Sequence, residues 1–327
     1  MANSNDISTH VTDNTANICD VESNYYSIQD FDHFNQIADI KNSFKAIHFN
    51  IQSLPAKFDF FKLLIEQLRE KAIDIDFIML CETFLKDGQE QFFQIPGYNL
   101  VTKNRTCKSR GGVALFISDK YSFTVRQDLS LFEEGEFESI FADVVNATET
   151  ITIGEIYRVP NTNEDESINK YDDVLSKLSR QKGPVIIGTD QNFNYLNIDT
   201  HTRTKDLFNC FLSNGLKPLI TKPTRITPNS ATLIDNLYIS LKNNRISKAG
   251  IIQTDISDHY PIFTFTGCKT KCTKQDSSSF EYRKINEKNI NQINQALLTE
   301  NWEVLHDKHT NEAYEYFYDK LYSAVNR

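Results

Sequence analysis

The sequence IDFIMLCE at residues 75–82 is a nearly continuous apolar run of strand length that ends directly at a glutamate. A short apolar run of this kind is typical of a β-strand buried on both faces. Upstream, KAIHF at residues 45–49 has the same character and runs straight into Asn50. Between the two runs, apolar residues recur at helical spacing over residues 58–68, after Pro55. The segment therefore predicts a strand, a helix and a second strand, with a polar side chain at the end of each strand.

The rest of the main segment also contains strand-like apolar runs and helical periodicity. Several strand pairs are separated only by turn residues, and helical periodicity returns at residues 165–180 and around residues 207–212. Further strands are expected at residues 113–117, 137–145, 151–156, 185–188, 234–240 and 261–265. Strand pairs joined by turns favour mixed sheets with helices outside them, so the predicted fold class is an α/β sandwich.

Composition suggests where the chain divides. With 39% hydrophobic and 24% charged residues among 327, the sequence is typical of a globular protein with a sizeable core. Residues 1–43 are expected to be a polar N-terminal arm and residues 44–266 the main domain. A linker rich in Lys, Thr and Ser is expected at residues 267–280, and a helical tail at residues 281–327.

No feature of the sequence suggests export or a membrane partner. The longest apolar stretch is far too short to span a bilayer, and the first 24 residues contain no apolar core of a secretory signal. Six cysteines are scattered without the spacing of a disulfide framework or a complete zinc site. We therefore expect an intracellular protein with reduced thiols.

Polar residues stand just past the ends of the expected strands. In α/β sheets, side chains at these places converge on a common crevice. Any single one is most often a turn former or a cap, but a set that supplies a metal ligand, an acid/base and phosphate donors favours a functional site. The set consists of Asn50, Glu82, Tyr157, Asp190 with Asn192, Asp235 and the pair Asp258-His259.

These residue types match the needs of phosphodiester cleavage, which are a cation on the phosphate, a positioned water and help for the leaving oxygen. Glu82 is a hard oxygen ligand suited to Mg²⁺, and Asn50 can orient the ligand set without adding charge. Asp190 is the natural partner for the water, and Asn192 can donate to a phosphate oxygen.

His259 can donate a proton or a hydrogen bond to the scissile phosphate, because its charge state is tunable near neutral pH. An imidazole needs an orienting carboxylate, for which Asp235 is the candidate. Asp258 adjoins the histidine, and its side chain is expected to point elsewhere, as a supporting or metal-adjacent carboxylate.

The charge distribution leaves two interpretations open. The net charge is −9, whereas proteins that grip DNA through phosphates usually carry a basic face. A local basic cluster precedes Gly111-Gly112, at Lys103, Arg105, Lys108 and Arg110. It is either the solvated rim of a hairpin or a loop in which Arg105 and Arg110 contact phosphate.

Taken in order, six short motifs resemble a known family. They are HFNIQSL (residues 48–54), CET (81–83), IYRVP (156–160), GTDQNF (188–193), TLIDNL (232–237) and SDHYP (257–261). The series looks like the endonuclease/exonuclease/phosphatase superfamily, and is most similar to the apurinic-like endonuclease domain of non-LTR retrotransposons of the jockey and related types. The similarity is collinear from Phe44 to Phe265.

The resemblance implies a four-layered α/β sandwich, in which two mixed β-sheets are flanked by helices. It also implies dependence on Mg²⁺, with Mn²⁺ as an alternative, and nicking of DNA that exposes a 3′ hydroxyl. The partners it implies are DNA, which suggests a nuclear location, and a reverse transcriptase domain. The tail, with Trp302, resembles the segment that precedes the polymerase in such elements.

The resemblance also assigns roles to the strand-end residues. Glu82 would bind the metal with Asn50 beside it, and Asp190 would activate the water. Asp235 would orient His259. The phosphate would be contacted by Tyr157, Asn192 and Thr232, and Asp258 fills the acidic position before the histidine.

Two positions depart from the family pattern. Gln52 stands where repair apurinic endonucleases carry an acidic neighbour of the metal, which favours the retroelement branch. Gly188 lies one residue farther from Asp190 than in the common Gly-Asp-x-Asn form. Two alternatives to a DNA endonuclease stay open: a phosphoesterase with another substrate, and a catalytically idle relic that binds nucleic acid. Because every proposed catalytic side chain is intact, the nuclease is the preferred hypothesis.

Overall fold

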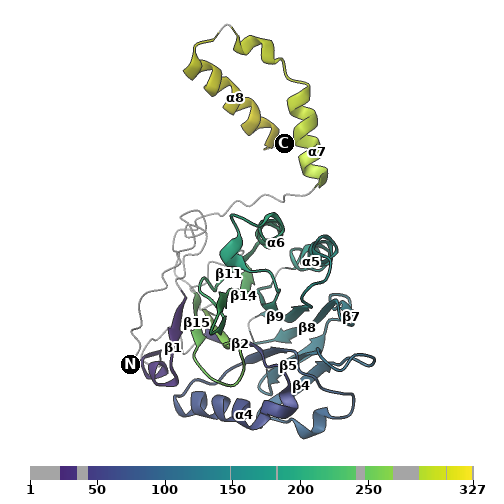
Figure 1. The fold of residues 1–327 in the computed structure, drawn as a ribbon, viewed down its shortest axis with the longest axis vertical. Helices are drawn as coiled ribbons and strands as arrows, with labels where there is room; N and C mark the ends of the chain where they lie inside the picture. The colour runs from purple at the N-terminus through teal and green to yellow at the C-terminus, as the bar shows by residue number, and fades with distance from the viewer. Residues whose placement is uncertain are drawn as a thin grey trace. The chain divides into compact units, whose positions relative to one another are not determined.

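The computed structural model describes residues 23–34, 43–147, 149–181, 183–240, 247–267, 287–306 and 308–325. Contacts divide the chain into two compact units, Met1–Phe280 and Glu281–Arg327. In the larger unit two β-sheets lie face to face, with α4 (Leu54–Glu70) on one outer side (Figure 1). On the other outer side lie α5 (Glu164–Leu178) and α6 (Thr202–Ser213).

The first sheet follows the order β1-β15-β16-β2-β3-β5-β4 in the described part of the chain. The pairs β1–β15 and β2–β3 are parallel and the other pairs are antiparallel, so the sheet is mixed. Its strands are β1 (Asn24–Tyr26), β2 (Ser43–Asn50), β3 (Phe77–Cys81), β4 (Tyr98–Lys103), β5 (Val113–Ser118), β15 (Ser247–Ile252) and β16 (Ile262–Gly267).

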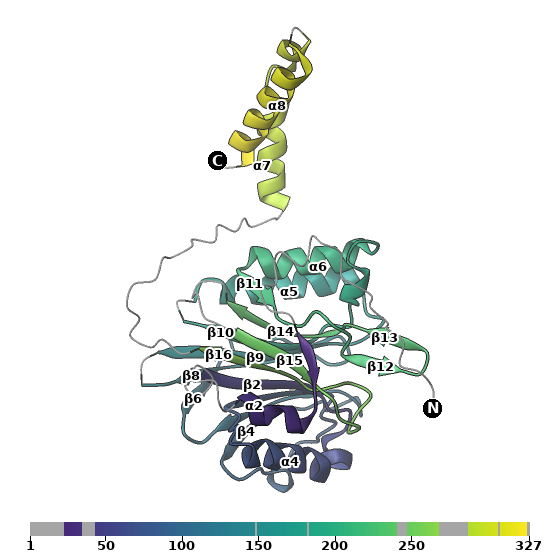
Figure 2. The ribbon, with the colours of Figure 1, turned by 90° about the vertical axis from the view of Figure 1, so that its left-hand side faces the viewer.

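The second sheet has the order β11-β14-β10-β9-β8-β6, and β7 pairs with β8 beside it. It too is mixed, since β9 and β10 are parallel while β10 and β14 are antiparallel. Its strands are β6 (Ser122–Val125), β7 (Phe132–Glu133), β8 (Phe137–Val145), β9 (Thr150–Arg158), β10 (Val185–Asp190), β11 (Leu216–Pro218) and β14 (Asp235–Ser240). A separate hairpin, β12 (Arg225–Thr227) and β13 (Ser230–Thr232), projects from the unit (Figure 2).

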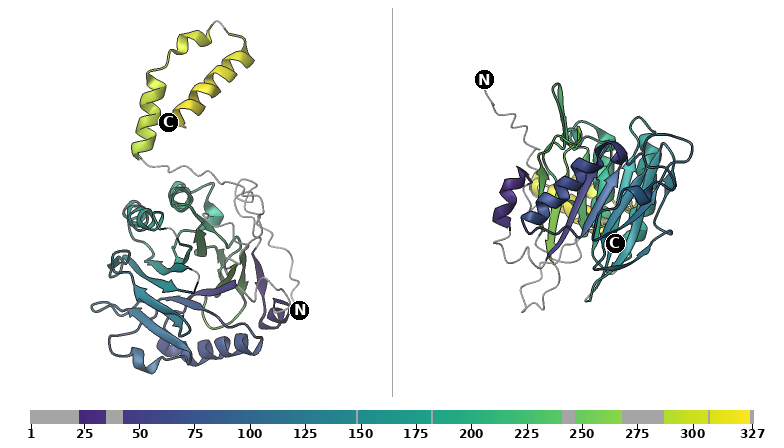
Figure 3. Two further views of the ribbon diagram at one scale, coloured as in Figure 1. Left: turned by 180° about the vertical axis from the view of Figure 1, so that it is seen from behind. Right: turned by 90° about the horizontal axis from the view of Figure 1, so that it is seen from below.

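Strand β2 shows why the apolar runs are uninterrupted. Phe44 and Ala46 belong to the core between the two sheets. Ile47 and Phe49 alternate with them and pack in the second core, with buried residues of α4. Views from behind and from below show the helices outside the paired sheets (Figure 3). The predicted four-layered α/β sandwich is therefore confirmed.

The N-terminal region differs from the expected polar arm at residues 1–43. Strand β1 pairs in parallel with β15, and the short helix α2 (Phe31–Phe34) follows it. Phe31 and Phe34 are buried, with ring centroids 5.0 and 5.9 Å from that of Phe263. Residues 23–34 thus form an edge of the sandwich, because a few aromatic anchors suffice to dock a polar segment. Residues 1–22 and 35–42 lie outside the described part.

The smaller unit contains α7 (Glu287–Leu298), a 3-10 turn at Trp302–Leu305 and α8 (Thr310–Val325). Trp302 donates from Nε1 to the carbonyl of Leu297 at 2.9 Å, and its ring lies 5.7 Å from that of Phe317. Most of the linker expected at residues 267–280 lies outside the described residues. Among the helices that are described, none combines the length and the apolar character needed to cross a membrane.

Candidate active site

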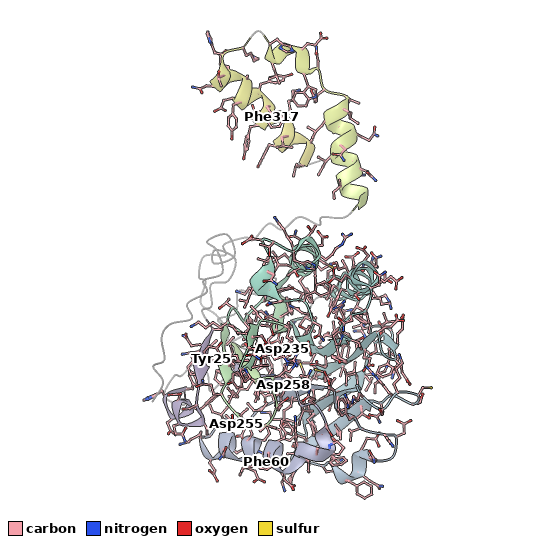
Figure 4. All side chains as sticks on the ribbon, in the orientation of Figure 1. Tyr25, Phe60, Asp235, Asp255, Asp258 and Phe317 are labelled. Carbon is pink, nitrogen blue, oxygen red and sulfur yellow. The ribbon has the colours of Figure 1, made fainter. Side chains whose placement is uncertain are left out.

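The register of the sheets brings the strand-end residues together. Asp190, the last residue of β10, lies opposite Tyr157 on β9 and opposite Asp235 on β14. On the facing sheet, Asn50 ends β2 opposite Cys81 of β3, so Glu82 follows immediately beyond that rung. Figure 4 marks Asp235 in this part of the larger unit. The parallel pairs β2–β3 and β9–β10 therefore open at one common edge, as expected for a site of this class.

Asn50 joins the two sheets within the site. Its Nδ2 donates to Oε1 of Glu82 at 2.9 Å and to Oδ2 of Asp190 at 2.7 Å. The hydroxyl of Tyr157 donates to the same Glu82 oxygen at 3.0 Å. Asn50, Tyr157 and Asp190 are buried, while Glu82 is partly exposed. Neutral donors thus hold two carboxylates that would otherwise repel each other.

A second cluster is built around Asp235. Its two carboxylate oxygens lie 3.0 and 2.9 Å from Nδ1 of His259, and Thr224 donates to Oδ2 at 2.6 Å. Burial alone would raise the pKa of Asp235, but the charges and hydrogen bonds of His259 and His48 hold it well below its usual range. Burial alone would lower the pKa of His259, but the Asp235 carboxylate raises it to about 9. The pair is therefore an imidazolium–carboxylate ion pair at neutral pH.

Asp190 lies between the two clusters. Burial, with the nearby carboxylates of Asp235 and Glu82, raises its pKa above the usual range. The hydrogen bond from Asn50 and the charge of His259 act in the opposite direction. A carboxylate whose pKa approaches neutrality can accept a proton from water, which is the property required of a general base.

The donor set fits a divalent cation. Asn50 Oδ1 is buried and has no hydrogen-bond partner among the described residues, an arrangement that calls for a ligand. Glu82 beside it accepts both of its hydrogen bonds on Oε1. Asp190, Asp235 and His259 also each offer a ligand atom, all within 4.8 Å of one another. We favour the Glu82–Asn50 position, because Asp235 and His259 already satisfy each other.

Comparison with known proteins finds a matching family model and solved structures of similar fold. A family model described as endonuclease-reverse transcriptase matches residues 151–263. The endonuclease domain of TRAS1, a telomere-specific non-LTR retrotransposon, matches in structure with a TM-score of 0.52 and 13% identity, covering 69% of this chain and 100% of that one. The chain therefore shares its fold with this endonuclease domain. The resemblance predicted from the sequence is thereby confirmed.

Two further structures share this fold. The AP endonuclease LMAP from Leishmania major has a TM-score of 0.56 at 12% identity, with 72% of this chain and 91% of that chain covered. TDP2 from D. rerio, complexed with a single strand DNA product, has a TM-score of 0.52 at 14% identity, with 69% and 99% covered. No curated protein matches the chain in sequence.

The remaining predicted site residues lie around this centre. Asn192 donates its backbone N–H to Asp190 Oδ1 at 3.2 Å and its side-chain amide to the carbonyl of Arg158 at 2.7 Å. Asp258 pairs with the guanidinium of Arg225 at 2.7 Å. Thr232 is partly buried at the end of the projecting hairpin.

The two arginines of the basic cluster differ. The side chain of Arg105 is only 8% exposed and forms an ion pair with the buried Glu138. That carboxylate also accepts from the backbone N–H of Gly112 at 2.7 Å. Arg105 therefore ties the loop between β4 and β5 to Glu138 of β8. This structural contact differs from the phosphate contact that was one of the two interpretations of the sequence. Arg110 is exposed on the same loop.

Sequence reasoning missed the residues beneath the centre. His48 lies on β2 and Glu155 on β9, both fully buried, with Nδ1 and Oε2 separated by 2.8 Å. Thr224, which bonds to Asp235, precedes the hairpin. The available signal was a titratable residue inside each of two apolar strands, since a buried charge must find a partner.

Proposed function

We propose that this chain is a divalent-metal-dependent DNA endonuclease that hydrolyses a phosphodiester bond and leaves a 3′ hydroxyl. The observation that carries the proposal is the continuous cluster in which Asn50 links Glu82 to Asp190 while Asp235 holds His259. The likeness to an endonuclease domain and to a structure holding a DNA product supports DNA as the substrate.

The cation is proposed to be Mg²⁺, with Mn²⁺ as a substitute, held by Glu82 and Asn50. When bound, it supplies positive charge to the scissile phosphate and to the leaving oxygen. Asn50 keeps its amide between Glu82 and Asp190, so the two carboxylates stay apart and correctly turned. Tyr157 fixes the remaining side of Glu82 through its hydroxyl.

The protein groups then divide the proton transfers. Asp190 orients a water and accepts its proton as the water attacks phosphorus, because its raised pKa makes it a base near neutral pH. His259, kept protonated by Asp235, donates to a phosphate oxygen and stabilises the charge that develops there. Asn192 is close enough to Asp190 to donate its amide to the same phosphate once its bond to Arg158 opens.

The surroundings of the centre give a modest grip on DNA. Thr232 on the hairpin and the exposed Arg110 are proposed phosphate contacts. With a net charge of −9, only such local contacts attract DNA, so the salt dependence of binding is expected to be shallow, in proportion to the few phosphates contacted. A nuclear location and a reverse transcriptase partner are part of the proposal, since the matching family description pairs endonuclease with reverse transcriptase.

Relaxation of supercoiled plasmid tests the proposal. The chain is incubated with Mg²⁺, with Mn²⁺ or with EDTA, beside Glu82→Ala, His259→Ala and the matched control Glu66→Ala on the exposed side of α4. Nicking is expected with either metal for the parent and the control only. Extension of the nicks by a DNA polymerase without prior phosphatase treatment shows the 3′ hydroxyl. Metal-independent nicking, or equal nicking by both site variants, contradicts the proposal, and cleavage of a different phosphoester alone redirects it to another substrate.

A further inference from the structure

A buried ion pair lies directly behind the proposed catalytic histidine. His48 on β2 and Glu155 on β9 come from opposite sheets and have no exposed surface. His48 Nδ1 lies 2.8 Å from Glu155 Oε2, and His48 Nε2 lies 3.5 Å from Asp235 Oδ1. Both ring nitrogens therefore face carboxylates, so the ring serves as a donor on each side. A series of side chains runs from Glu155 through His48 and Asp235 to His259.

The backbone around the pair is shaped to admit it. Gly188 on β10 lies against both side chains, and a Cβ there would come within 2.6 Å of Glu155 Oε2 and 2.8 Å of His48 Nδ1. Such contacts are too short for real atoms, so only glycine leaves room for the pair.

Burying the His48–Glu155 pair costs free energy of folding, so its presence suggests a functional role. Taking an imidazolium and a carboxylate out of water is expensive, and well-packed apolar residues of similar volume are often at least as stable. With Glu155 beside Nδ1 and Asp235 beside Nε2, both ring nitrogens of His48 face a carboxylate. The pair therefore places a fixed donor beneath Asp235, whose other neighbours are His259 and Thr224.

We propose that His48, held by Glu155, is a positioning residue that fixes the Asp235 carboxylate and through it the imidazole of His259. The inference rests on the proposed function, because His259 is the group that acts on the phosphate. Asp235 is clamped on one side by Thr224 and on the other by His48, so its oxygens stay turned toward His259 Nδ1. Loss of the His48 side lets the carboxylate rotate and misaligns the imidazole.

A competing interpretation is a metal site, since Cys81 also lies within reach of His48 and Glu155. The 2.8 Å separation of His48 Nδ1 and Glu155 Oε2 is that of a charge-assisted hydrogen bond. A cation bound to both atoms would have to displace this bond, so the hydrogen-bonded pair is the better account.

The kinetic test uses His48→Gln and, as a second variant, Gly188→Ala, which separates the pair without changing its chemistry. Removing such outer partners typically lowers activity by about 10- to 100-fold. We expect that loss in kcat with KM unchanged, and no further loss when His48→Gln is added to His259→Ala. The control is Asp76→Asn, a buried carboxylate bonded to the Lys45 N–H at the opposite end of β3, which is expected to keep the parent kcat.

A second measurement is independent of activity. The imidazole ¹⁵N resonances of His259 report its hydrogen bond to Asp235 directly, in EDTA and without DNA. They are expected to shift in His48→Gln and Gly188→Ala and to stay in place in Asp76→Asn. Unchanged resonances in both variants overturn the inference, whatever the chain cleaves. So does zinc bound stoichiometrically to the purified chain and lost in both His48→Gln and Cys81→Ser.

A failure of the proposed function can be distinguished from a failure of the positioning role of His48. If His259→Ala nicks as fast as the parent, the proposed function fails, and the resonances still decide whether His48 positions Asp235. If His259→Ala loses nicking while His48→Gln keeps the parent kcat, only the positioning role is wrong.

Discussion

Replacing Asn50 by aspartate tests the link between the two carboxylates without changing the shape of the side chain. In the parent, Asn50 Nδ2 donates to Glu82 at 2.9 Å and to Asp190 at 2.7 Å from a position that is 1% exposed. In Asn50→Asp, both donors are replaced by an acceptor, and three carboxylates meet in one buried place. The variant must then bind a proton or a cation there to remain folded.

The magnitude follows from the two lost bonds. Hydrogen bonds to charged groups contribute about 1.5–3 kcal/mol each, so their loss removes about 3–6 kcal/mol from the free energy of unfolding. For a domain of this size each kcal/mol lowers Tm by about 2–4 °C, which gives a drop of about 6–24 °C. The loss is largest in EDTA above neutral pH, and it shrinks when the pH is lowered or Mg²⁺ is added, because either event neutralises a carboxylate.

Thermal unfolding of parent and variant, with EDTA or Mg²⁺ at acidic and alkaline pH, measures this directly. The matched control is Asn236→Asp, in which a buried amide accepts from the backbone N–H groups of Leu219 and Ile220 at 3.0 and 3.1 Å. That variant is expected to lose its contact to the Ile220 carbonyl and to gain nothing from Mg²⁺. An Asn50→Asp chain as stable as the parent in EDTA at alkaline pH would refute the bridging role of Asn50.

Three further outcomes are expected. In EDTA, the parent is expected to be more stable than His259→Gln by at most about 3 kcal/mol. This difference is fully present below pH ~6.5 and is lost as the pH rises through the folded pKa of about 9. Denaturant unfolding at a series of pH values measures it, and a difference that does not change with pH contradicts the ion pair. Tyr157→Phe removes the hydroxyl that holds Glu82 at 3.0 Å, so plasmid nicking at fixed Mg²⁺ should fall by about 10- to 100-fold; full activity argues against that contact. Phe34→Ala opens a cavity against Phe263 and should cost about 3–5 kcal/mol in urea unfolding; an unchanged midpoint means that residues 23–34 are not part of the core.

The sequence alone predicted the strands that are buried on both faces, because a run of apolar residues of strand length is not expected to be exposed to solvent. Strands β2, β3 and β10 were predicted in this way, together with the polar residues that end them. The hairpin β12–β13 and strand β15 were not, since short strands with polar or mixed residues carry no periodicity that differs from a loop.

The pairing register of the strands could not be predicted from the sequence, for a different reason. Asp190 faces Tyr157 and Asp235 only because β9, β10 and β14 pair in one particular alignment. A slip of one residue would turn each side chain to the other face of the sheet. The candidate residues and the pairs Glu82–Asn50 and Asp235–His259 could therefore be predicted, but the alignment that places Asp190 between the two pairs required the structure.

Gly111 and Gly112, which precede β5, have a structural role: they hold the turn that carries Glu82. Glu82 has a positive φ of 50°, a conformation that non-glycine residues adopt at a cost of about 1–3 kcal/mol unless their surroundings impose it. Those surroundings are the backbone bonds from Thr83 N–H to Gly112 at 3.3 Å and from Phe84 N–H to Gly111 at 2.8 Å.

Gly112 itself has a φ of 88°, and a Cβ there would lie 2.7 Å from the hydroxyl of Thr83. Its N–H is held by Glu138, the same carboxylate that binds Arg105. The basic loop thus supports the turn that carries Glu82, the residue proposed to bind the metal. Arg105, one of the two arginines considered as phosphate contacts, fixes the backbone of this turn through Glu138.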